Sequence, residues 1–430
     1  MRKYGALWSI FLALLLLLSG CSNPQKKKTG EEATSKTSTE QTIKIGVLAD
    51  LSGSLSTIGT DIKNAASIAK EQVNKFFKSK GYPYKVEIYV EDTQINPSIC
   101  LKKVQAFKAK GVNLAVGPMA SSEVKNISNY LTANKMIIIS PSSTALPSLL
   151  GFTKPEEKKY IFRFVPNDAF QGKAIASVIK SLGYKKVLVI FREDAWGRGL
   201  ENAAVDNLKK LGIKILGEIG YPSTPEPSDW SPYIEKMTKL AKGNSPQDTA
   251  ILAITFEEVA TLLSQIKDNS PLLSYKWFGS DGSVDSSKVL EEAKDKAIKI
   301  KLYSTIFYSV SPSAKALKEE YEKKGYGKEI TQYALNSYDA IWVLAKSYID
   351  MLKATGKYNA DVLVKEIRKN VKEYSKGVWG VKPVTGPIVL NEWNDRASGN
   401  YAIHIVTPEG WKTAGIWDST TGKVAWTIKQ

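Results

Sequence analysis

The sequence predicts an α/β protein with two lobes, each built around a parallel central sheet. Short apolar runs alternate with amphipathic stretches from about residue 43 onward, which is the pattern of a parallel sheet covered by helices on both faces. The same alternation begins again after residue 166, and helical patterns return after residue 306. The chain is therefore expected to pass between the lobes more than once, with a ligand-binding cleft where they meet.

Residues 42–165 predict the first part of one lobe. The expected helices carry ordinary start and stop signals, such as Pro97, which suits a first helical turn, and Gly111, which ends the same helix. The predicted order is strand, helix, strand, helix, strand, helix, strand, with strands at 43–48, 84–90, 112–116 and 136–139.

Two hydroxyl clusters follow neighbouring strands of this lobe. Ligands bind beyond the carboxyl ends of parallel strands, where the first turns of helices present unpaired N–H groups and a partial positive charge. Hydroxyls and amides together suit a small anion such as a carboxylate. Ser121 alone would be explained as a helix N-cap, but two clusters in adjacent turns favour a site. Their members are Ser121 and Ser122 in the first turn, and Ser142, Ser143 and Thr144 in the second.

Residues 166–305 predict the first part of the second lobe. The expected strand 276–279 ends in Ser-Asp-Gly-Ser, which includes Asp281 and is ordinary turn chemistry on its own. Residues 306–385 are expected to return to the first lobe as helices, and residues 386–430 to the second lobe as short strands. The other strands predicted in this lobe are 186–191, 213–219, 249–255 and 298–304.

The N-terminal residues predict export and anchoring. Arg2 and Lys3 precede an apolar core, residues 6–18, that is too short for a permanent membrane span, so residues 1–20 are expected to be a signal peptide. The sequence Leu-Ser-Gly-Cys that ends at Cys21 resembles the lipobox of bacterial lipoproteins, which implies that Cys21 carries lipid; an incidental cysteine after a plain signal peptide is the alternative. Residues 21–41 then form the lipidated cysteine and a flexible linker.

Composition argues against nucleic-acid binding and catalysis. The chain has 430 residues and a net charge of +17, but its basic residues are mostly lysines scattered over predicted helix faces. His404 is the single histidine and Cys100 the only cysteine besides Cys21, so we expect no zinc site, no Ser-His-Asp triad and no internal disulfide. No Walker A sequence or GxGxxG follows a strand. We expect no metal, no cofactor and no reaction.

Six segments follow one another in a specific order along the chain. They are IKIGVLADLSGSLSTIGTDIKNAASIA, VGPMASS, IIISPSSTALP, VLVIFREDAWGRGL, DWSPYIEKM and WFGSDG. Together they resemble the Leu/Ile/Val-binding protein family, the type I solute-binding proteins of ABC importers, and the resemblance covers nearly everything from Ile43 to the C-terminal region. It implies the type I periplasmic-binding-protein fold, in which two Rossmann-like lobes are joined by a multi-crossover hinge.

The resemblance also implies roles for individual residues. The hydroxyl clusters would hold the α-carboxylate of an amino acid, an acid of the second lobe would hold its ammonium, and two aromatic walls would flank it. Ile58 falls where many members carry an aromatic residue and Phe256 where many carry a tyrosine, which leaves the side-chain specificity open. The family's first-lobe disulfide is also absent. The implied ligand-binding residues are Ser121, Ser122, Ser142 and Thr144 for the carboxylate, Asp281 for the ammonium, and Trp196 and Phe256 for the walls.

We therefore expect an extracytoplasmic, lipid-anchored solute-binding protein of an ABC importer. It would close its lobes around a branched-chain or other apolar amino acid and deliver it to a membrane permease. Receptors for an amide, urea or aromatic acid remain alternatives, because such ligands lack the ammonium. A ligand-sensing ectodomain or an exported enzyme are further alternatives, and the first would need a transmembrane segment that we do not find after residue 21.

Overall fold

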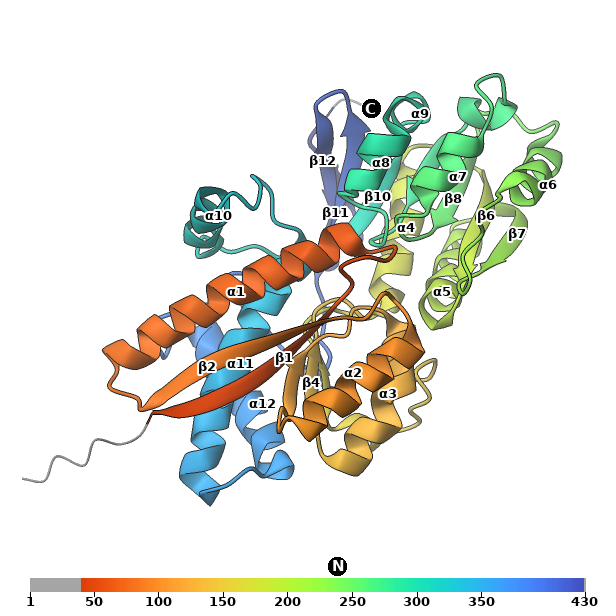
Figure 1. Ribbon diagram of the computed structural model, residues 1–430. Helices are drawn as coiled ribbons and strands as arrows, with labels where there is room; N and C mark the ends of the chain where they lie inside the picture. Colours follow the sequence, from red (N-terminus) through yellow and green to blue (C-terminus); the bar gives the residue numbers. More distant parts are fainter. Residues whose placement is uncertain (1–39, 429–430) are drawn as a thin grey trace, which may run out of the picture. The chain divides into compact units, whose positions relative to one another are not determined.

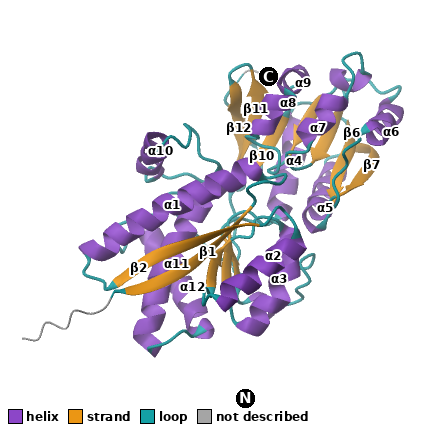
Figure 2. Ribbon diagram, in the orientation of Figure 1, coloured by secondary structure: helices purple, strands orange, loops and turns teal. Residues whose placement is uncertain are grey.

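Two β-sheets organise residues 40–428, which are the residues that this computed structural model describes (Figures 1 and 2). The five-stranded sheet has the order β2-β1-β3-β4-β5, and the eight-stranded sheet has the order β13-β12-β11-β10-β9-β8-β6-β7. We call the first sheet with its helices the first lobe and the second sheet with its helices the second lobe. Both lobes belong to one compact unit that starts at Glu40.

The first sheet is parallel throughout, as expected. Its central strands are short and apolar because both faces are covered by helices. Ile138 of β4 contributes to the core beneath α2 and α3, whereas its neighbours Ile137 and Ile139 contribute to the core beneath α1 and α11. The strands are β1 (Gln41–Ala49), β2 (Tyr84–Asp92), β3 (Leu114–Val116), β4 (Ile137–Ser140) and β5 (Ile161–Arg163).

Helices from two separate parts of the chain cover this sheet. The long helix α11, which comes late in the sequence, packs beside α1, which follows the first strand (Figure 1). The helices of this lobe are α1 (Ser56–Ser79), α2 (Pro97–Ala109), α3 (Ser121–Asn134), α10 (Ala314–Lys323), α11 (Gln332–Thr355) and α12 (Ala360–Lys376), with a short 3₁₀ turn at Pro155–Lys158.

The second sheet combines a parallel part with an antiparallel edge. Five strands run parallel, namely β6 (Lys186–Glu193), β7 (Lys214–Pro222), β8 (Thr249–Ile254), β9 (Lys276–Gly279) and β10 (Tyr303–Tyr308). The C-terminal strands β11 (Asn400–Thr407), β12 (Gly410–Trp417) and β13 (Val424–Trp426) extend the sheet in antiparallel order. The helices are α4 (Asp168–Ser181), α5 (Ala195–Lys210), α6 (Ser231–Ala241), α7 (Val259–Gln265), α8 (Ser287–Glu292) and α9 (Lys294–Lys299), with a 3₁₀ turn at Pro271–Ser274.

One predicted strand is wrong. Residues 298–304 alternate in polarity, but the structure continues helix α9 to Lys299 and starts β10 only at Tyr303. Ala297 and Ile300 are three residues apart and both are buried in the core of the second lobe, which is helical rather than strand spacing. Lys301 then adopts a left-handed conformation with φ of 46°, which ends the helix before the strand.

The chain crosses between the lobes at slightly different points from those expected. The expected boundary at residue 306 falls inside β10, so the return to the first lobe starts after Tyr308. Asp395 still belongs to the first lobe, because it pairs with Arg163 at the end of β5, and the final crossing comes between Arg396 and Asn400 rather than at residue 386. Short apolar runs in a crossing segment do not reveal which lobe they pack against.

The predictions for the N-terminus fall mostly outside the described residues. The expected signal peptide, residues 1–20, and Cys21 lie there, as does all of the expected linker except Glu40 and Gln41. Strand β1 begins at Gln41, one residue before the expected start of the folded body. Among residues 40–428, no helix combines the length and apolar character needed to cross a membrane.

Candidate ligand-binding site

A pocket lies where the two lobes meet, at the carboxyl ends of strands from both sheets. Between the side chains as they stand, its volume is only about 20 Å³, which is room for roughly one water molecule, so lining side chains must shift to admit an amino acid. The first lobe contributes the residues after β1, β3 and β4 and one residue of α11, and the second lobe contributes the residues after β8 and β9 and one of α5. The lining residues are Leu55, Ile58, Met119, Ala120, Ser121, Ser142, Trp196, Phe256, Asp281, Gly282 and Tyr333.

Ser121 links the two hydroxyl turns and does not cap its helix. The N-cap position of α3 is Ala120, whose backbone N–H donates to Glu123 Oε2 at 3.1 Å. The Ser121 hydroxyl instead lies 2.9 Å from Ser143 Oγ and accepts a hydrogen bond from the Ala145 amide at 3.1 Å. A hydroxyl held in this way, at the positive end of a helix, is placed to meet an anion in the pocket.

Ser142 joins the same pair of turns from the other side. Its hydroxyl donates to the carbonyl oxygen of Met119 at 3.1 Å, and its neighbour Ser140 donates to Pro118 O at 2.6 Å. These bonds fix the turn after β4 against the turn after β3. The structure therefore builds the polar end of the pocket from two adjacent strand exits, as the sequence predicted for Ser121 and Ser142.

Two of the predicted carboxylate ligands do not line the pocket. Ser122 follows Ser121 on α3 but is not among the lining residues. Thr144 is buried and is not among the lining residues, and its carbonyl oxygen accepts a hydrogen bond from the Asp168 amide at 2.8 Å. The sequence does not distinguish Ser122 and Thr144 from the residues that line the pocket, because all five members of the clusters are serine or threonine.

Asp281 supplies a buried carboxyl group at the exit of β9. Tyr333 of α11 donates its hydroxyl to Asp281 Oδ2 at 2.6 Å, whereas Oδ1 is buried without a hydrogen-bond partner among the described residues. Burial raises the pKa of Asp281 to about 6, against the lowering effect of the Tyr333 hydroxyl. A buried carboxyl group with one unoccupied oxygen is a strong acceptor for an ammonium group.

A second buried acid, Asp168, stands close enough to Asp281 to be affected by the charge of Asp281. It opens helix α4, and neither of its carboxyl oxygens has a hydrogen-bond partner among residues 40–428. Burial and, after it, the negative charge of Asp281 raise the pKa of Asp168 well above its ordinary value. The two carboxyl groups therefore share less than two negative charges near neutral pH. Asp168 does not stand out in the sequence, because an acid after Asn167 is a common helix start.

Trp196 and Phe256 form a stacked aromatic wall on the second lobe. Their ring centroids are 4.5 Å apart with an interplanar angle of 27°, and the Arg192 guanidinium lies 4.6 Å from the centre of the Phe256 ring. Trp196 is fixed at the start of α5, where Asp194 accepts its backbone N–H at 3.0 Å. Both aromatic residues were predicted as walls, and the structure brings them together.

Aliphatic side chains complete the apolar part of the pocket. Leu55, Ile58 and Met119 line it from the first lobe, and all three are buried. Ile58 occupies the place where the resemblance led us to look for an aromatic residue. Leu55, Met119 and Tyr333 were missed, because apolar residues at helix starts and a tyrosine inside α11 look like core residues in a sequence.

Neither Cys100 nor His404 lines the pocket. Cys100 is fully buried in α2, and burial raises the pKa of its thiol well above the ordinary value. His404 lies in β11, and its Nδ1 is 2.7 Å from Asp285 Oδ1. Within residues 40–428, no group of three or more His, Cys, Asp or Glu residues is arranged to hold a metal ion.

Comparisons with known proteins agree with this fold. A family model described as periplasmic binding protein matches residues 42–407. The protein of Methanocaldococcus jannaschii named Uncharacterized protein MJ1266 is 57% identical over 97% of this chain and 99% of its own length. The Leu/Ile/Val-binding protein BraC3 of Rhizobium johnstonii is 24% identical over 84% of this chain and 91% of its own length.

Solved structures show the same fold. The leucine binding protein LivK of Thermotoga maritima has a TM-score of 0.70 and 23% identity, covering 87% of this chain and 98% of its own. The substrate binding protein LivJ of Streptococcus pneumoniae, in complex with isoleucine, has a TM-score of 0.69 and 21% identity, covering 90% and 100%. A solute binding protein of Rhodopseudomonas palustris, in complex with 3,4-dihydroxy benzoic acid, has a TM-score of 0.65 and 21% identity, covering 88% and 98%.

Two α/β lobes with a small pocket between them define a solute-binding protein of the type I periplasmic class. The chain belongs to the periplasmic binding protein family. The proteins it resembles in fold are solute-binding proteins rather than enzymes.

Proposed function

We propose that the protein binds an amino acid with a small apolar side chain and delivers it to the permease of an ABC importer. The single observation that carries the proposal is the composition of the pocket. It joins two hydroxyl turns, a buried carboxyl group with an unoccupied oxygen, and a wall of aliphatic and aromatic side chains.

Each part of an amino acid has a counterpart in this pocket. The α-carboxylate meets the Ser121 hydroxyl at the start of α3, close to the turn that carries Ser142. The ammonium meets Asp281 Oδ1, and its positive charge lowers the pKa of this carboxyl group and keeps it ionised. The side chain lies among the apolar wall residues, which are Leu55, Ile58, Met119, Trp196 and Phe256.

The buried acids and the aliphatic walls favour this class of ligand over polar ones. An ammonium that leaves water needs a full charge partner, and Asp281 supplies one. A ligand with a polar side chain would need an additional polar group in the pocket wall. Beyond the residues assigned to the carboxylate and the ammonium, the lining offers only Tyr333, which already donates its hydroxyl to Asp281. Leucine, isoleucine and valine are therefore the ligands to test first.

A receptor for an aromatic acid is the second candidate. Its support is the raised pKa of Asp281, because a protonated Asp281 would donate to a neutral oxygen instead of accepting from an ammonium. The stacked Trp196 and Phe256 rings would then face an aromatic ligand. A structural relative that holds a dihydroxybenzoic acid makes this alternative concrete.

A thermal-shift screen of the full chain separates the two candidates. The panel contains the twenty amino acids, simple amides, urea and hydroxybenzoic acids. A ligand at about 100 times its Kd stabilises the folded protein by about 2.7 kcal/mol, which is readily measured. Stabilisation by leucine, isoleucine or valine supports the proposal, whereas stabilisation only by compounds without an ammonium refutes it in favour of the second candidate.

We also propose that the protein is held at the extracytoplasmic face of the membrane by lipid on Cys21. The support is the apolar segment 6–18 and the Leu-Ser-Gly-Cys sequence after it. Membrane fractionation with mass spectrometry of the N-terminal peptide tests this. The Cys21→Ser variant is expected to leave the membrane fraction, and a wild-type peptide without added lipid would contradict the anchor.

A further inference from the structure

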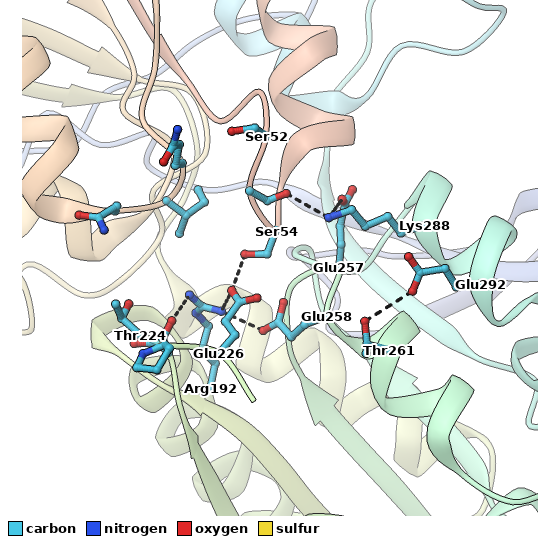
Figure 3. Close-up of a pocket in the computed structure, with 16 residues that line it drawn as sticks. Ser52, Ser54, Arg192, Thr224, Glu226, Glu257, Glu258, Thr261, Lys288 and Glu292 are labelled. Atoms are coloured by element: carbon cyan, nitrogen blue, oxygen red, sulfur yellow. Dashed lines mark hydrogen bonds and ion pairs between the residues drawn. The ribbon is translucent and has the colours of Figure 1, made fainter. Parts of the chain in front are cut away.

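The turn after β1 contacts the second lobe directly at the rim of the ligand pocket. Ser54 Oγ donates to Glu226 Oε1 at 2.7 Å, and the backbone N–H of Glu257 donates to Ser54 O at 3.0 Å. Lys288 Nζ donates to Gly53 O at 3.2 Å. These groups surround a cavity of about 360 Å³ that both lobes line, and Figure 3 shows Ser54 between Glu226 and Glu257.

The first turn of α1 adds further contacts of the same kind. Thr57 Oγ1 is 3.0 Å from Ser287 Oγ and accepts the Ser287 backbone N–H at 3.3 Å. Ser56 Oγ lies 3.4 Å from Glu257 Oε2. Every residue of segment 53–57 except Leu55 therefore makes a polar bond with the second lobe.

Glu226, on the second-lobe side of these bonds, is held in place by Arg192. Arg192 is buried, and its guanidinium bonds to Glu226 Oε1 at 2.5 Å, Glu258 Oε1 at 3.0 Å and Asp194 Oδ2 at 2.9 Å. Its last nitrogen donates to Ser223 O at 3.0 Å. Glu226 is thus oriented by Arg192 before Ser54 arrives, which reduces the entropy lost when the bond forms.

These polar contacts lie outside the ligand pocket. Leu55 is the one residue of segment 53–57 that lines the pocket, and Glu226, Glu257, Ser287 and Lys288 do not line it. The energy of the contacts therefore does not depend on which ligand is bound. It depends only on whether the two lobes are together.

We propose that segment 53–57 and the second-lobe residues Glu226, Glu257, Ser287 and Lys288 form an interlobe clasp. The clasp stabilises the closed arrangement of the lobes without touching the ligand, and Glu257 couples closure to the uptake of a proton. The role of the clasp rests on the proposed function in one respect, namely that a solute binds between the lobes.

Glu257 gives the clasp its dependence on pH. It is 1% exposed, and burial raises the pKa of its carboxyl group to about 7, against the lowering effects of Thr57 and Lys288. Lys288 Nζ of α8 lies 3.9 Å away, and Asp50 of the turn after β1 adds a smaller raising effect. The other charged groups on the same cavity are Arg192, Glu226, Glu258 and Glu292.

The sign of the effect follows from burial. When the lobes separate, Glu257 meets water and its pKa falls toward the ordinary value of 4.5. Because the closed form has the higher pKa, protonation of Glu257 stabilises closure. This contribution is complete below the ordinary value and is lost as the pH rises through about 7. Ligand affinity should therefore fall between pH 6.5 and pH 8.

Leucine titration of the full chain tests the clasp through its lack of ligand selectivity. Ser54→Ala removes a hydrogen bond to a charged group, so we expect the Kd for leucine, isoleucine and valine to rise by one common factor, about tenfold. Glu291→Gln, on the exposed side of α8 and outside the cavity, is the matched control and should change none of the three. Unchanged affinities, or a loss confined to one ligand, would overturn the proposal.

The proton coupling is tested by Glu257→Gln. The wild type should bind leucine more weakly at pH 8 than at pH 6.5, and the variant should show no such fall. A fall of equal size in the variant would show that Glu257 is not the coupled group.

A ligand-free measurement separates failure of the clasp from failure of the proposed ligand. Spin labels on Lys125→Cys of α3 and Lys236→Cys of α6, both exposed positions on different lobes, report the distance between the lobes. Ser54→Ala should shift the distance distribution toward longer distances even without any solute. An unchanged distribution overturns the clasp, whatever the solute proves to be.

Discussion

Tyr333 donates a hydrogen bond of 2.6 Å to Asp281 across the boundary between the lobes. Tyr333 belongs to α11, which packs on the first sheet, whereas Asp281 follows β9 of the second sheet. The bond therefore forms only when the lobes are together. It also orients the acid that we assign to the ligand's ammonium, so closure and ligand recognition depend on the same pair.

Asp281→Asn should abolish tight binding of amino acids. The variant keeps the volume of the side chain but leaves a buried ammonium without a charge partner, and such losses typically weaken binding by 2–5 kcal/mol or more. We expect the Kd for leucine to rise at least about 30-fold in isothermal titration. Asp268→Asn, at a position 92% exposed in the same lobe, serves as the control. Leucine binding at wild-type strength in Asp281→Asn would exclude this role.

Tyr333→Phe should shift the pH dependence of binding upward. The Tyr333 hydroxyl lowers the pKa of Asp281, which burial raises to about 6, so its removal raises that pKa further. Because the ammonium needs an ionised carboxyl group, the affinity for leucine rises as the pH passes the pKa of Asp281. The midpoint of this rise, measured by titration from pH 5 to pH 7.5, should lie higher in the variant. A midpoint at or below that of the wild type would contradict the bond's role.

Ser121→Ala and Ser122→Ala should differ although they are neighbours. Ser121 lines the pocket and joins Ser143 and Ala145, whereas Ser122 does not line the pocket. A lost hydrogen bond to a carboxylate typically weakens binding about tenfold or more, so Ser121→Ala should raise the Kd for leucine by that factor. Ser122→Ala should leave it within about twofold. Equal effects of the two substitutions would show that the carboxylate is held elsewhere.

Asp395→Ala should destabilise the first lobe strongly. Asp395 bonds Arg163 Nη2 at 2.5 Å and Lys158 Nζ at 2.7 Å, and all three side chains are fully buried. Although burial opposes it, the charges of Arg163 and Lys158 hold the pKa of Asp395 below its ordinary value of 3.8. Its stabilising contribution is therefore present above that value and is lost as the pH falls below it.

Denaturant unfolding at pH 7 measures this effect. Removal of one partner from a buried ion cluster typically costs about 3–5 kcal/mol, because it leaves two buried cations. The exposed pair of Lys159 and Asp361 provides the comparison, and Asp361→Ala should cost less than about 1 kcal/mol. If Asp395→Ala lowers the free energy of unfolding by as little as Asp361→Ala does, the buried ion cluster of Asp395 does not stabilise the crossing segment.

The sequence was sufficient to predict the lobes because strands and helices alternate with distinct periods. Runs such as Ile137–Ser140 are apolar on both faces, and the amphipathic face of α1 repeats at helical spacing. The segment 298–304 shows the limit of this reasoning. Its alternating polarity is compatible with a strand, yet packing of Ala297 and Ile300 extends the helix.

The polar residues of the pocket were predictable where they follow a strand exit and not where they come from elsewhere in the chain. Ser121, Ser142 and Asp281 each follow a strand, so their meeting at one cleft follows from the topology. Tyr333 and Asp168 reach the site from helices α11 and α4, and only the crossings between the lobes bring them there. The clasp residues Ser54 and Glu226 likewise lie 172 positions apart, and no local pattern links them.

Titration of the full chain with leucine and two of its fragments tests the central claim most directly. Isocaproate lacks the ammonium, and isoamylamine lacks the carboxylate. A pocket that holds both groups should bind leucine tightly, and the Kd of each fragment should be higher than that of leucine by about 30-fold or more. Isocaproate that binds as tightly as leucine would contradict the role of Asp281 and, with it, the assignment of this protein to amino-acid binding.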